Sequence, residues 1–281
     1  MIKITVIISI YKDIEALNLI LQSLNTQTIS DFDIVVSQDC QSQEITDYIS
    51  SYSLPIKLTH IDQPDKGWQK NIALNNAIKK SSGEYLIFLD GDVIPYKSFI
   101  ENHINSAEKK RFLSGRRVEL GSFFSKMIRK QKFSVRVIEK LYLFLIPFLA
   151  LDKARHIEEG ISLKKDTYLE KKINSNKNKN MVPIGCNFSC FKEDLLTING
   201  FDEDYLSPSI GEDGDLVWRF NHFGITYKSV RYIANVFHLY HTRNWGNANK
   251  ENRNMMKEKI IKKEYICHNG LNKLYKPFYK R

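Results

Sequence analysis

Leu86-Ile87-Phe88-Leu89-Asp90-Gly91-Asp92 is the stretch that decides the fold of this chain. Its apolar residues predict a buried strand that ends abruptly in two carboxylates, and open α/β sheets bind ligands at the carboxyl ends of their strands. A second acidic cluster, Gly211-Glu212-Asp213-Gly214-Asp215, follows much later, and His238-Leu239-Tyr240-His241 comes after it. Together the three stretches indicate a metal-dependent enzyme.

The residues around this strand alternate between strand and helix patterns. Strands are predicted over Ile2–Ile10, Phe32–Ser37, Ile56–Ile61 and Glu84–Leu89, and helices over Asp13–Leu24, Glu44–Ser50 and Trp68–Lys80. The alternation predicts a mostly parallel α/β sheet with right-handed crossovers. The absence of G-x-G-x-x-G and G-x-x-x-x-G-K-[ST] motifs argues against a dinucleotide-binding Rossmann protein and a P-loop protein.

The chain has 281 residues, of which 42% are hydrophobic, and a formal net charge of +10. This composition is typical of a globular protein. Nucleic acid, an anionic membrane surface or a phosphorylated substrate would each account for the charge, and so would a lysine-rich solvated surface. Because the basic residues concentrate after about residue 108, the excess lies outside the predicted site.

The four cysteines show no dense disulfide framework, and Met1–Ser9 is typical of a first strand rather than a signal peptide. A cytoplasmic, reducing location is therefore expected. Cys186 and Cys190 are interpreted as core thiols, because no second cysteine pair accompanies them for metal binding.

A basic and apolar segment interrupts the α/β pattern. Leu141–Leu151 is apolar around Pro147 but too short for a bilayer, which needs about 20 residues. With the basic residues upstream of it, the segment fits an interfacial membrane contact. A buried helix on the sheet or a dimer contact is the alternative interpretation. The upstream basic residues are Lys126, Arg129, Lys130, Lys132, Arg136 and Lys140.

Carboxylate oxygens such as those of Asp90 and Asp92 suit Mg²⁺ or Mn²⁺ on a diphosphate. His238 and His241 follow a predicted strand end, where two imidazoles can close on one ion and favour Mn²⁺. Two unrelated histidines are the alternative. Asp213 fits a helix N-terminus, and the same placement would let it take a proton from a hydroxyl as a general base.

These motifs resemble, in order and spacing, the nucleotide-sugar glycosyltransferases of family 2, which have the GT-A fold. The later part resembles the β-1,4-galactosyltransferase and chondroitin-polymerase branch, in which an N-G-F segment precedes a G-E-D-x-D motif and late metal ligands. The resemblance covers residues 1–105 and 181–245. The stretches that carry it are Ser9-Ile10-Tyr11, Val35–Asp39, Gly67-x-x-Lys70-Asn71, Asp90–Pro95, Ile198–Asp202, Gly211–Asp215 and His238-x-x-His241.

The resemblance implies a GT-A fold with a Rossmann-like, mostly parallel mixed sheet flanked by helices and a helical insert. It implies Asp213 as the catalytic base, Glu212 as a ligand of sugar hydroxyls, and Mn²⁺ or Mg²⁺ held by Asp92, His238 and His241. The implied donor-binding residues are Ile10, Tyr11, Asp39, Gly67, Lys70, Asp90 and Gly91. The implied organisation is a nucleotide-sugar-binding half (1–105), a basic helical and apolar insert (106–180), an acceptor and metal half (181–245) and a basic C-terminal helix and tail (246–281).

Two stretches depart from the family pattern. Ser37-Gln38-Asp39-Cys40 offers only one acid to the nucleotide, which weakens the case for uracil over other bases. Leu206–Ile210 replaces the aromatic-glycine lid of the galactosyltransferases, so aromatic stacking under the acceptor sugar is not expected from this loop.

The function expected is that of an inverting, metal-dependent enzyme. It would move a hexose or N-acetylhexosamine of the Gal, GalNAc, Glc or GlcNAc type from a UDP-sugar to a glycan or lipid-linked glycan, in synthesis of a bacterial capsule or lipopolysaccharide. It would be cytoplasmic, with peripheral contact to the anionic inner face of the cell membrane. An inactive sugar-binding partner subunit is the alternative, which intact Asp92, Asp213, His238 and His241 disfavour. A nucleic-acid-binding module is disfavoured because the carboxylate clusters would repel a polyanion.

Overall fold

A computed structural model describes residues 2–53, 55–177, 184–208, 210–211, 213–242 and 248–274. Glu212, predicted to bind sugar hydroxyls, and the tail after residue 274 lie outside these ranges. The strands are β1 (Ile4–Ile10), β2 (Asp33–Gln38), β3 (Leu58–Asp62), β4 (Tyr85–Asp90), β5 (Val93–Pro95), β6 (Arg111–Ser114), β7 (Arg117–Glu119), β8 (Asn187–Phe191), β9 (Thr226–Ser229) and β10 (Val236–His238).

The helices lie between and after these strands. They are α1 (Ile14–Leu24), α2 (Gln43–Ser51), α3 (Lys70–Lys80), α4 (Phe99–Ser106), α5 (Ser122–Arg129), α6 (Val135–Lys140), α7 (Tyr142–Leu151), the 3₁₀ helix η1 (Ile157–Gly160), α8 (Tyr168–Lys177), α9 (Lys192–Thr197), α10 (Asp213–His222) and α11 (Ala248–Ile261). Asp13, the first residue of the predicted helix, caps α1, since its Oδ1 accepts a hydrogen bond from the Ala16 amide at 2.9 Å.

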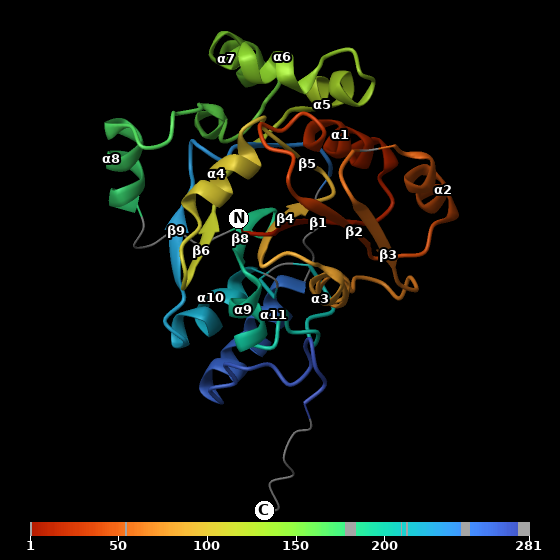
Figure 1. Cartoon of the computed structure of the whole chain (residues 1–281), viewed down its shortest axis with the longest axis vertical. Helices are drawn as coiled ribbons and strands as arrows, with labels where there is room; N and C mark the ends of the chain where they lie inside the picture. The colour runs from red at the N-terminus through yellow and green to blue at the C-terminus, as the bar shows by residue number, and fades with distance from the viewer. Residues whose placement is uncertain are drawn as a thin grey trace, which may run out of the picture.

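The main sheet has seven strands in the order β3-β2-β1-β4-β8-β6-β9 (Figure 1). The first four are parallel, β8 runs antiparallel to β4 and β6, and β9 is parallel to β6. A smaller sheet has the order β5-β10-β7. The predicted α/β fold with a mostly parallel mixed sheet is confirmed. The segment predicted as a helical insert begins with two strands, β6 and β7, and its helices start at Ser122.

Helices cover both faces of the main sheet. Because side chains alternate along a strand, Val6, Ile8 and Ile10 of β1 pack toward α1, α2 and α4, whereas Ile7 packs toward α3, α9 and α10. Figure 1 shows α3, α9 and α10 below the sheet and α1 and α2 above it. Burial on both faces explains the continuous apolar runs of the parallel strands. Cys40, Cys186, Cys190 and Cys267 are buried free thiols, as interpreted from the sequence for Cys186 and Cys190.

The chain segments directly before and directly after helices α5–α7 lie side by side. On the two sides of these helices, Glu119 and Arg155 exchange two backbone hydrogen bonds of 3.0 and 2.8 Å. Gly121 lies directly against Asp152, and any side chain at Gly121 would collide with it. These two pairs form the neck of the segment. Within the described ranges, every helix is too short or too polar to cross a bilayer.

Candidate functional site

A cleft of about 1100 Å³ lies at the carboxyl ends of β1, β2 and β4. The register of these parallel strands pairs Ile10 with Gln38 and Ser9 with Asp90, so the residues that follow each strand meet at one edge of the sheet. Every residue predicted to bind the donor lines this cleft, as do Asp92 and His241. The donor-binding predictions are Ile10, Tyr11, Asp39, Gly67, Lys70, Asp90 and Gly91.

Gly91 permits the close approach of the loop after β4 to strand β1. A Cβ atom at this position would lie 2.8 Å from the Ile10 Cγ2 and 2.9 Å from the Ser9 backbone oxygen. Such contacts are too short for any other residue, so the glycine holds Asp90 and Asp92 against the end of β1. The resemblance implied that Gly91 binds the donor, and the structure adds its approach to this neighbouring strand.

Asp39 is a buried carboxylate at the end of β2. Its Oδ1 accepts a hydrogen bond from Gln63 Nε2 at 2.7 Å, and its Oδ2 accepts one from the Gln69 amide at 2.8 Å. Burial raises the pKa of Asp39, and the two hydrogen bonds oppose that rise. The carboxylate is therefore fixed in position at the cleft wall, bonded to the residue that precedes helix α3.

Lys70 and Asp90 form an ion pair inside the cleft. The distance from Lys70 Nζ to Asp90 Oδ1 is 2.6 Å, and both side chains are mostly buried. Lys70 is the first residue of α3, whereas Asp90 ends β4, so the pair joins two elements that the sequence placed in separate motifs. A positive charge at this point suits a phosphate-bearing ligand in the cleft.

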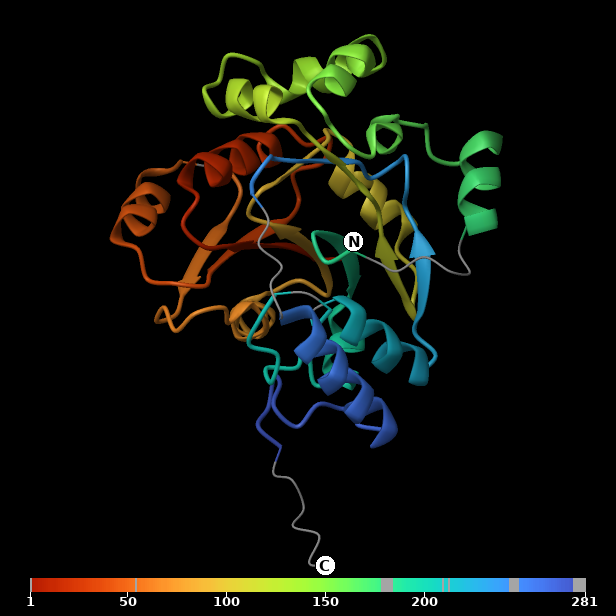
Figure 2. The same cartoon turned by 180° about the vertical axis from the view of Figure 1, so that it is seen from behind.

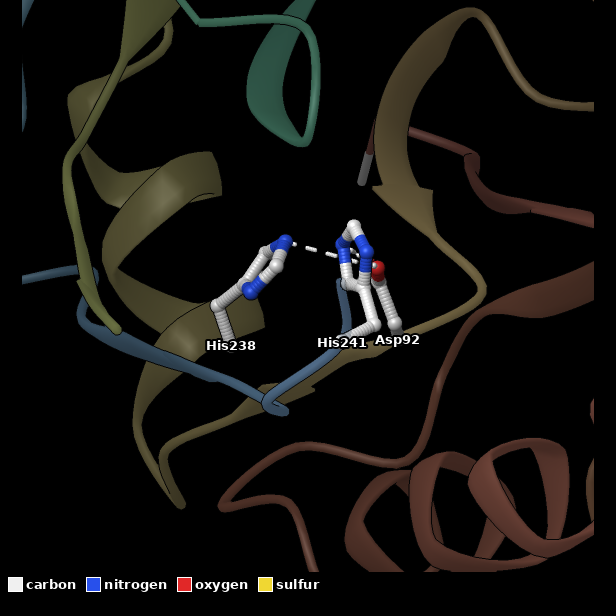
Figure 3. A group of neighbouring side chains, drawn as sticks. All are labelled: Asp92, His238 and His241. Carbon is white, nitrogen blue, oxygen red and sulfur yellow. Dashed lines mark ion pairs between the residues drawn. The ribbon is translucent and has the colours of Figure 1, made fainter. Parts of the chain in front are cut away.

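Asp92, His238 and His241 form the predicted metal group, and Figure 3 shows both imidazoles near the Asp92 carboxylate. Asp92 Oδ2 lies 3.3 Å from His238 Nε2 and 3.2 Å from His241 Nε2. Burial acts to raise the pKa of Asp92, but the hydrogen bond to His241 and the charges of both imidazoles lower it to about 2. His238 belongs to β10, which pairs with β5 directly after Asp92, and this pairing brings the three residues together.

These residues fit a divalent cation. Two ligands at right angles on bonds of about 2.1 Å lie about 3 Å apart, close to the separations observed between the Asp92 and histidine atoms. Asp92 Oδ1 is buried and has no hydrogen-bond partner among the described residues, which leaves an acceptor available to an ion. One carboxylate and two imidazoles are ligands that divalent transition-metal ions accept.

Asp213 is the first residue of α10. Its Oδ1 accepts from the Gly214 amide at 2.7 Å and its Oδ2 accepts from the Gly185 amide at 3.1 Å. Burial raises the pKa of Asp213, these hydrogen bonds and Lys70 oppose the rise, and Asp90 adds to it. The charges of Lys70 and Asp90 therefore both act on the pKa of Asp213. Asp215 is instead buried in an ion pair with Arg219, away from the cleft.

Sequence reasoning missed several residues of the cleft. Tyr11 Oη and Lys12 Nζ both donate to Asp65 Oδ2, at 2.8 and 2.9 Å, and so join two loops at the cleft mouth. Arg129 of α5 also lines the cleft and forms two hydrogen bonds of 2.7 and 2.6 Å with Asp13. The cleft residues that the sequence did not assign thus include Lys12, Arg129 and also Trp68, an unassigned position of Gly67-x-x-Lys70, whereas Tyr11 was predicted and only its bond to Asp65 was not.

Comparisons with known proteins agree with this geometry. The family model described as glycosyl transferase family 2 matches residues 5–193, and a model described as the N-terminal domain of galactosyltransferase matches residues 172–242. An uncharacterized glycosyltransferase of Rickettsia bellii is 27% identical over 143 residues, 50% of this chain and 20% of that protein. Validoxylamine A glucosyltransferase of Streptomyces hygroscopicus subsp. jinggangensis is 28% identical over 101 residues, 35% of this chain and 24% of that protein. The matches thus span under a quarter of these two relatives.

Solved structures share the fold over 92% of this chain. TarS of S. aureus superposes with a TM-score of 0.58 at 14% identity over 40% of its own chain. GalNAc-T7, solved with UDP, GalNAc and Mn²⁺, gives 0.60 at 13% identity over 48% of its chain. The mannosyltransferase PcManGT of Pyrobaculum calidifontis, solved with GDP-Man and Mn²⁺, gives 0.59 at 14% identity over 64% of its chain. The fold of the present chain is therefore GT-A.

Proposed function

This chain belongs to glycosyl transferase family 2, and we propose that it moves a hexose or N-acetylhexosamine from a UDP-sugar to a glycan hydroxyl with inversion at the anomeric carbon. It is a glycosyltransferase; its donor, acceptor and mechanism are the proposal. The observation that carries the proposal is the group of Asp92, His238 and His241 beside a cleft that contains all the donor-binding residues predicted from the sequence.

The nucleotide would occupy the part of the cleft between the ends of β1 and β2. Tyr11 and Asp39 would contact the uracil and ribose, Gly67 and Lys70 would lie beside the nucleotide, and Asp90 would lie near the ribose. Asp39 supports this assignment because its oxygens are held rigidly by Gln63 and Gln69. The similar structures include complexes with both UDP and GDP-Man, so the choice of uracil rests on the sequence resemblance.

Asp92, His238 and His241 would hold Mn²⁺, with Mg²⁺ as the alternative. When bound, the ion would neutralise negative charge that develops on the leaving diphosphate. Lys70 adds a positive charge at the same side of the cleft, which also favours binding of the diphosphate.

Asp213 would act as the general base. In the proposed step, the acceptor hydroxyl oxygen forms a bond to the anomeric carbon while the bond from that carbon to the UDP oxygen breaks. The hydroxyl proton passes to Asp213, and UDP leaves with the bonding electron pair. Attack from the side opposite the leaving group inverts the anomeric configuration. The raised pKa of Asp213 makes its carboxylate a stronger base than an exposed aspartate.

The acceptor class is proposed from the resemblance to the β-1,4-galactosyltransferase and chondroitin-polymerase branch. We infer a glycan of a bacterial surface polysaccharide, either capsule or lipopolysaccharide. The match to glycosyltransferases of bacteria is in keeping with this proposal. Measurable transfer or hydrolysis of a UDP-sugar would exclude the alternative of an inactive sugar-binding subunit.

A calorimetric titration with UDP, in the presence and absence of Mn²⁺, tests the donor site. We expect UDP binding that requires Mn²⁺ and exceeds the binding of GDP. His241→Ala should weaken Mn²⁺-dependent UDP binding by about tenfold or more, because a ligand of the ion is lost. His156→Ala, at an exposed histidine outside the cleft, is the matched control and should bind as the parent protein does. Absence of UDP binding in both conditions, or an unchanged Mn²⁺ titration in His241→Ala, would contradict the proposed site.

A further inference from the structure

Helices α5, α6 and α7 form a layer at one end of the molecule, and Figures 1 and 2 show it opposite the end that carries α9, α10 and α11. Large apolar side chains of this layer face solvent; Phe144 and Leu151 are 71% and 81% exposed. We call these exposed residues the α5–α7 face: Phe123, Phe133, Val137, Leu141, Leu143, Phe144, Phe148 and Leu151. The ring centroids of Phe144 and Phe148 lie 6.1 Å apart, and exposed apolar side chains that gather in this way mark an interaction site.

Helix α7 is apolar around its whole circumference but packs against the protein on one side only. Tyr142 and Leu149 are buried among the core residues, whereas most of the other side chains are exposed. The structure therefore does not support the interpretation of this segment as a buried helix on the sheet. A helix that is apolar on all sides is normally buried, so we expect another molecule or surface to cover the exposed side of α7.

Exposed positive charge lies beside these apolar side chains. The lysines are Lys126, Lys130, Lys132, Lys140 and Lys153, all of them exposed. Between Ser122 and His156 the acids are Glu139 and Asp152, and both are engaged inside the protein. Glu139 pairs with Arg136 at 2.6 Å, and Asp152 accepts two backbone hydrogen bonds of 2.9 Å at the start of α5. The face thus combines apolar side chains with an uncompensated cationic rim.

We propose that the α5–α7 face docks on an anionic lipid surface. Phe144, Phe148 and Leu151 would enter the boundary between headgroups and acyl chains, while the lysines would contact anionic headgroups. Helix α7 has 10 residues, which suits a contact in the plane of the interface rather than a span. A second copy of this chain is a poorer occupant, because a symmetric contact would set the same lysines against one another.

Docking by this face would also place the cleft close to the lipid surface. Lys126 of helix α5 and Lys130 directly after it are exposed, while Arg129 of α5 lines the cleft and binds Asp13. A lipid-linked acceptor at the membrane would then lie near the proposed donor site. This consequence rests on the proposed function, whereas the docking itself does not.

Flotation of the full chain with vesicles, in the absence of nucleotide and acceptor, tests the docking separately from catalysis. We expect binding to phosphatidylcholine vesicles that contain phosphatidylglycerol, weak binding to phosphatidylcholine alone, and release at high salt. Phe144→Glu with Leu151→Glu should lower binding by about tenfold or more. The matched control is Ile261→Glu, at a side chain that is 79% exposed on α11 at the other end of the molecule, and it should bind as the parent does.

Lysine-to-glutamate variants distinguish binding to an anionic lipid surface from binding to a second copy of the chain. Lys126→Glu with Lys130→Glu should lower binding to anionic vesicles by about tenfold, whereas Lys250→Glu with Lys257→Glu on α11 should leave it unchanged. Failure of the parent protein to float with anionic vesicles would overturn the proposal. A dimer that dissociates on Phe144→Glu, without vesicle binding by the parent, would assign the face to a second copy instead. Thermal unfolding of each variant verifies that it is folded.

Discussion

At the scale of single residues, the proposed base is the most direct assignment to test. Asp213→Asn keeps an oxygen that can accept a backbone hydrogen bond but removes the group that takes the proton. We expect kcat to fall by about 10²–10⁴, with UDP affinity nearly unchanged, because the loss concerns the transfer step alone. Steady-state transfer and calorimetry measure the two quantities. Asp31→Asn, at an exposed aspartate before β2, is the control; near-normal turnover of Asp213→Asn would discard the base assignment.

The pH dependence of transfer offers a second test of Asp213. A general base works only when ionised, so kcat should fall as the pH is lowered through the pKa of Asp213, which burial raises above its ordinary value. Lys70 lowers this pKa, and Lys70→Met should therefore move the acid limb of the kcat profile to higher pH.

Lys12→Met is the matched control for this profile, since Lys12 lines the cleft but bonds to Asp65 at its mouth. Its acid limb should coincide with that of the parent enzyme. An acid limb that stays in place after Lys70→Met would mean that a group other than Asp213 controls the rate.

Single residues also show what sequence reasoning could reach at this site. Asp92 was predictable because it follows an apolar strand, and His238 and His241 because they lie at the end of another. The Lys12–Asp65 and Arg129–Asp13 pairs join residues that are 53 and 116 positions apart. Neither pair has a motif or a periodicity of its own, so only the folded chain reveals that Arg129 reaches the cleft.

At the scale of elements, helix α10 depends on a buried ion pair for its position. Arg219 donates to Asp215 Oδ2 through Nε at 2.7 Å and to the backbone oxygens of Ile198 and Gly200 through Nη1 at 3.0 and 2.8 Å. Arg219→Met should lower the free energy of unfolding by about 3–5 kcal/mol, because it leaves the Asp215 charge buried and unpaired.

Urea unfolding measures the free energy of unfolding of Arg219→Met, and a variant at an exposed ion pair serves for comparison. Lys109 lies 2.5 Å from Glu193, and both side chains are more than half exposed. Lys109→Met should therefore cost about 1 kcal/mol or less. Equal losses in the two variants would show that the Arg219–Asp215 pair does not hold α10 in the way proposed.

The bounds of the longer elements were predicted to within a few residues, because a periodic pattern of apolar residues can be recognised in a long segment. The pattern over Trp68–Lys80 predicted α3, which begins at Lys70. The three-residue strands β5 and β7 are too short for any period to be detected, whereas β10 was expected from the apolar residues before His238. The apolar composition of α7 indicated burial against something, but composition does not say whether protein or lipid covers a helix.

At the scale of the whole molecule, the two stretches that resemble family 2 enzymes form one continuous sheet. Strand β8, from the later stretch, pairs with β4 from the earlier one, and Phe88 stacks on Phe188 across this pair with ring centroids 4.4 Å apart. The parallel half of the sheet was predictable from the alternation of patterns. The antiparallel half was not, because the order of β4, β8 and β6 is set by contacts between distant segments.

The neck formed by Glu119 with Arg155 and by Gly121 with Asp152 has an evolutionary consequence. A segment whose two ends lie side by side can gain or lose residues without moving the strands that flank it. In descendants of this chain, the surface formed by helices α6 and α7 can therefore change while the cleft keeps its geometry. Changes there would alter what the molecule can adhere to and leave the residues of the cleft where they are.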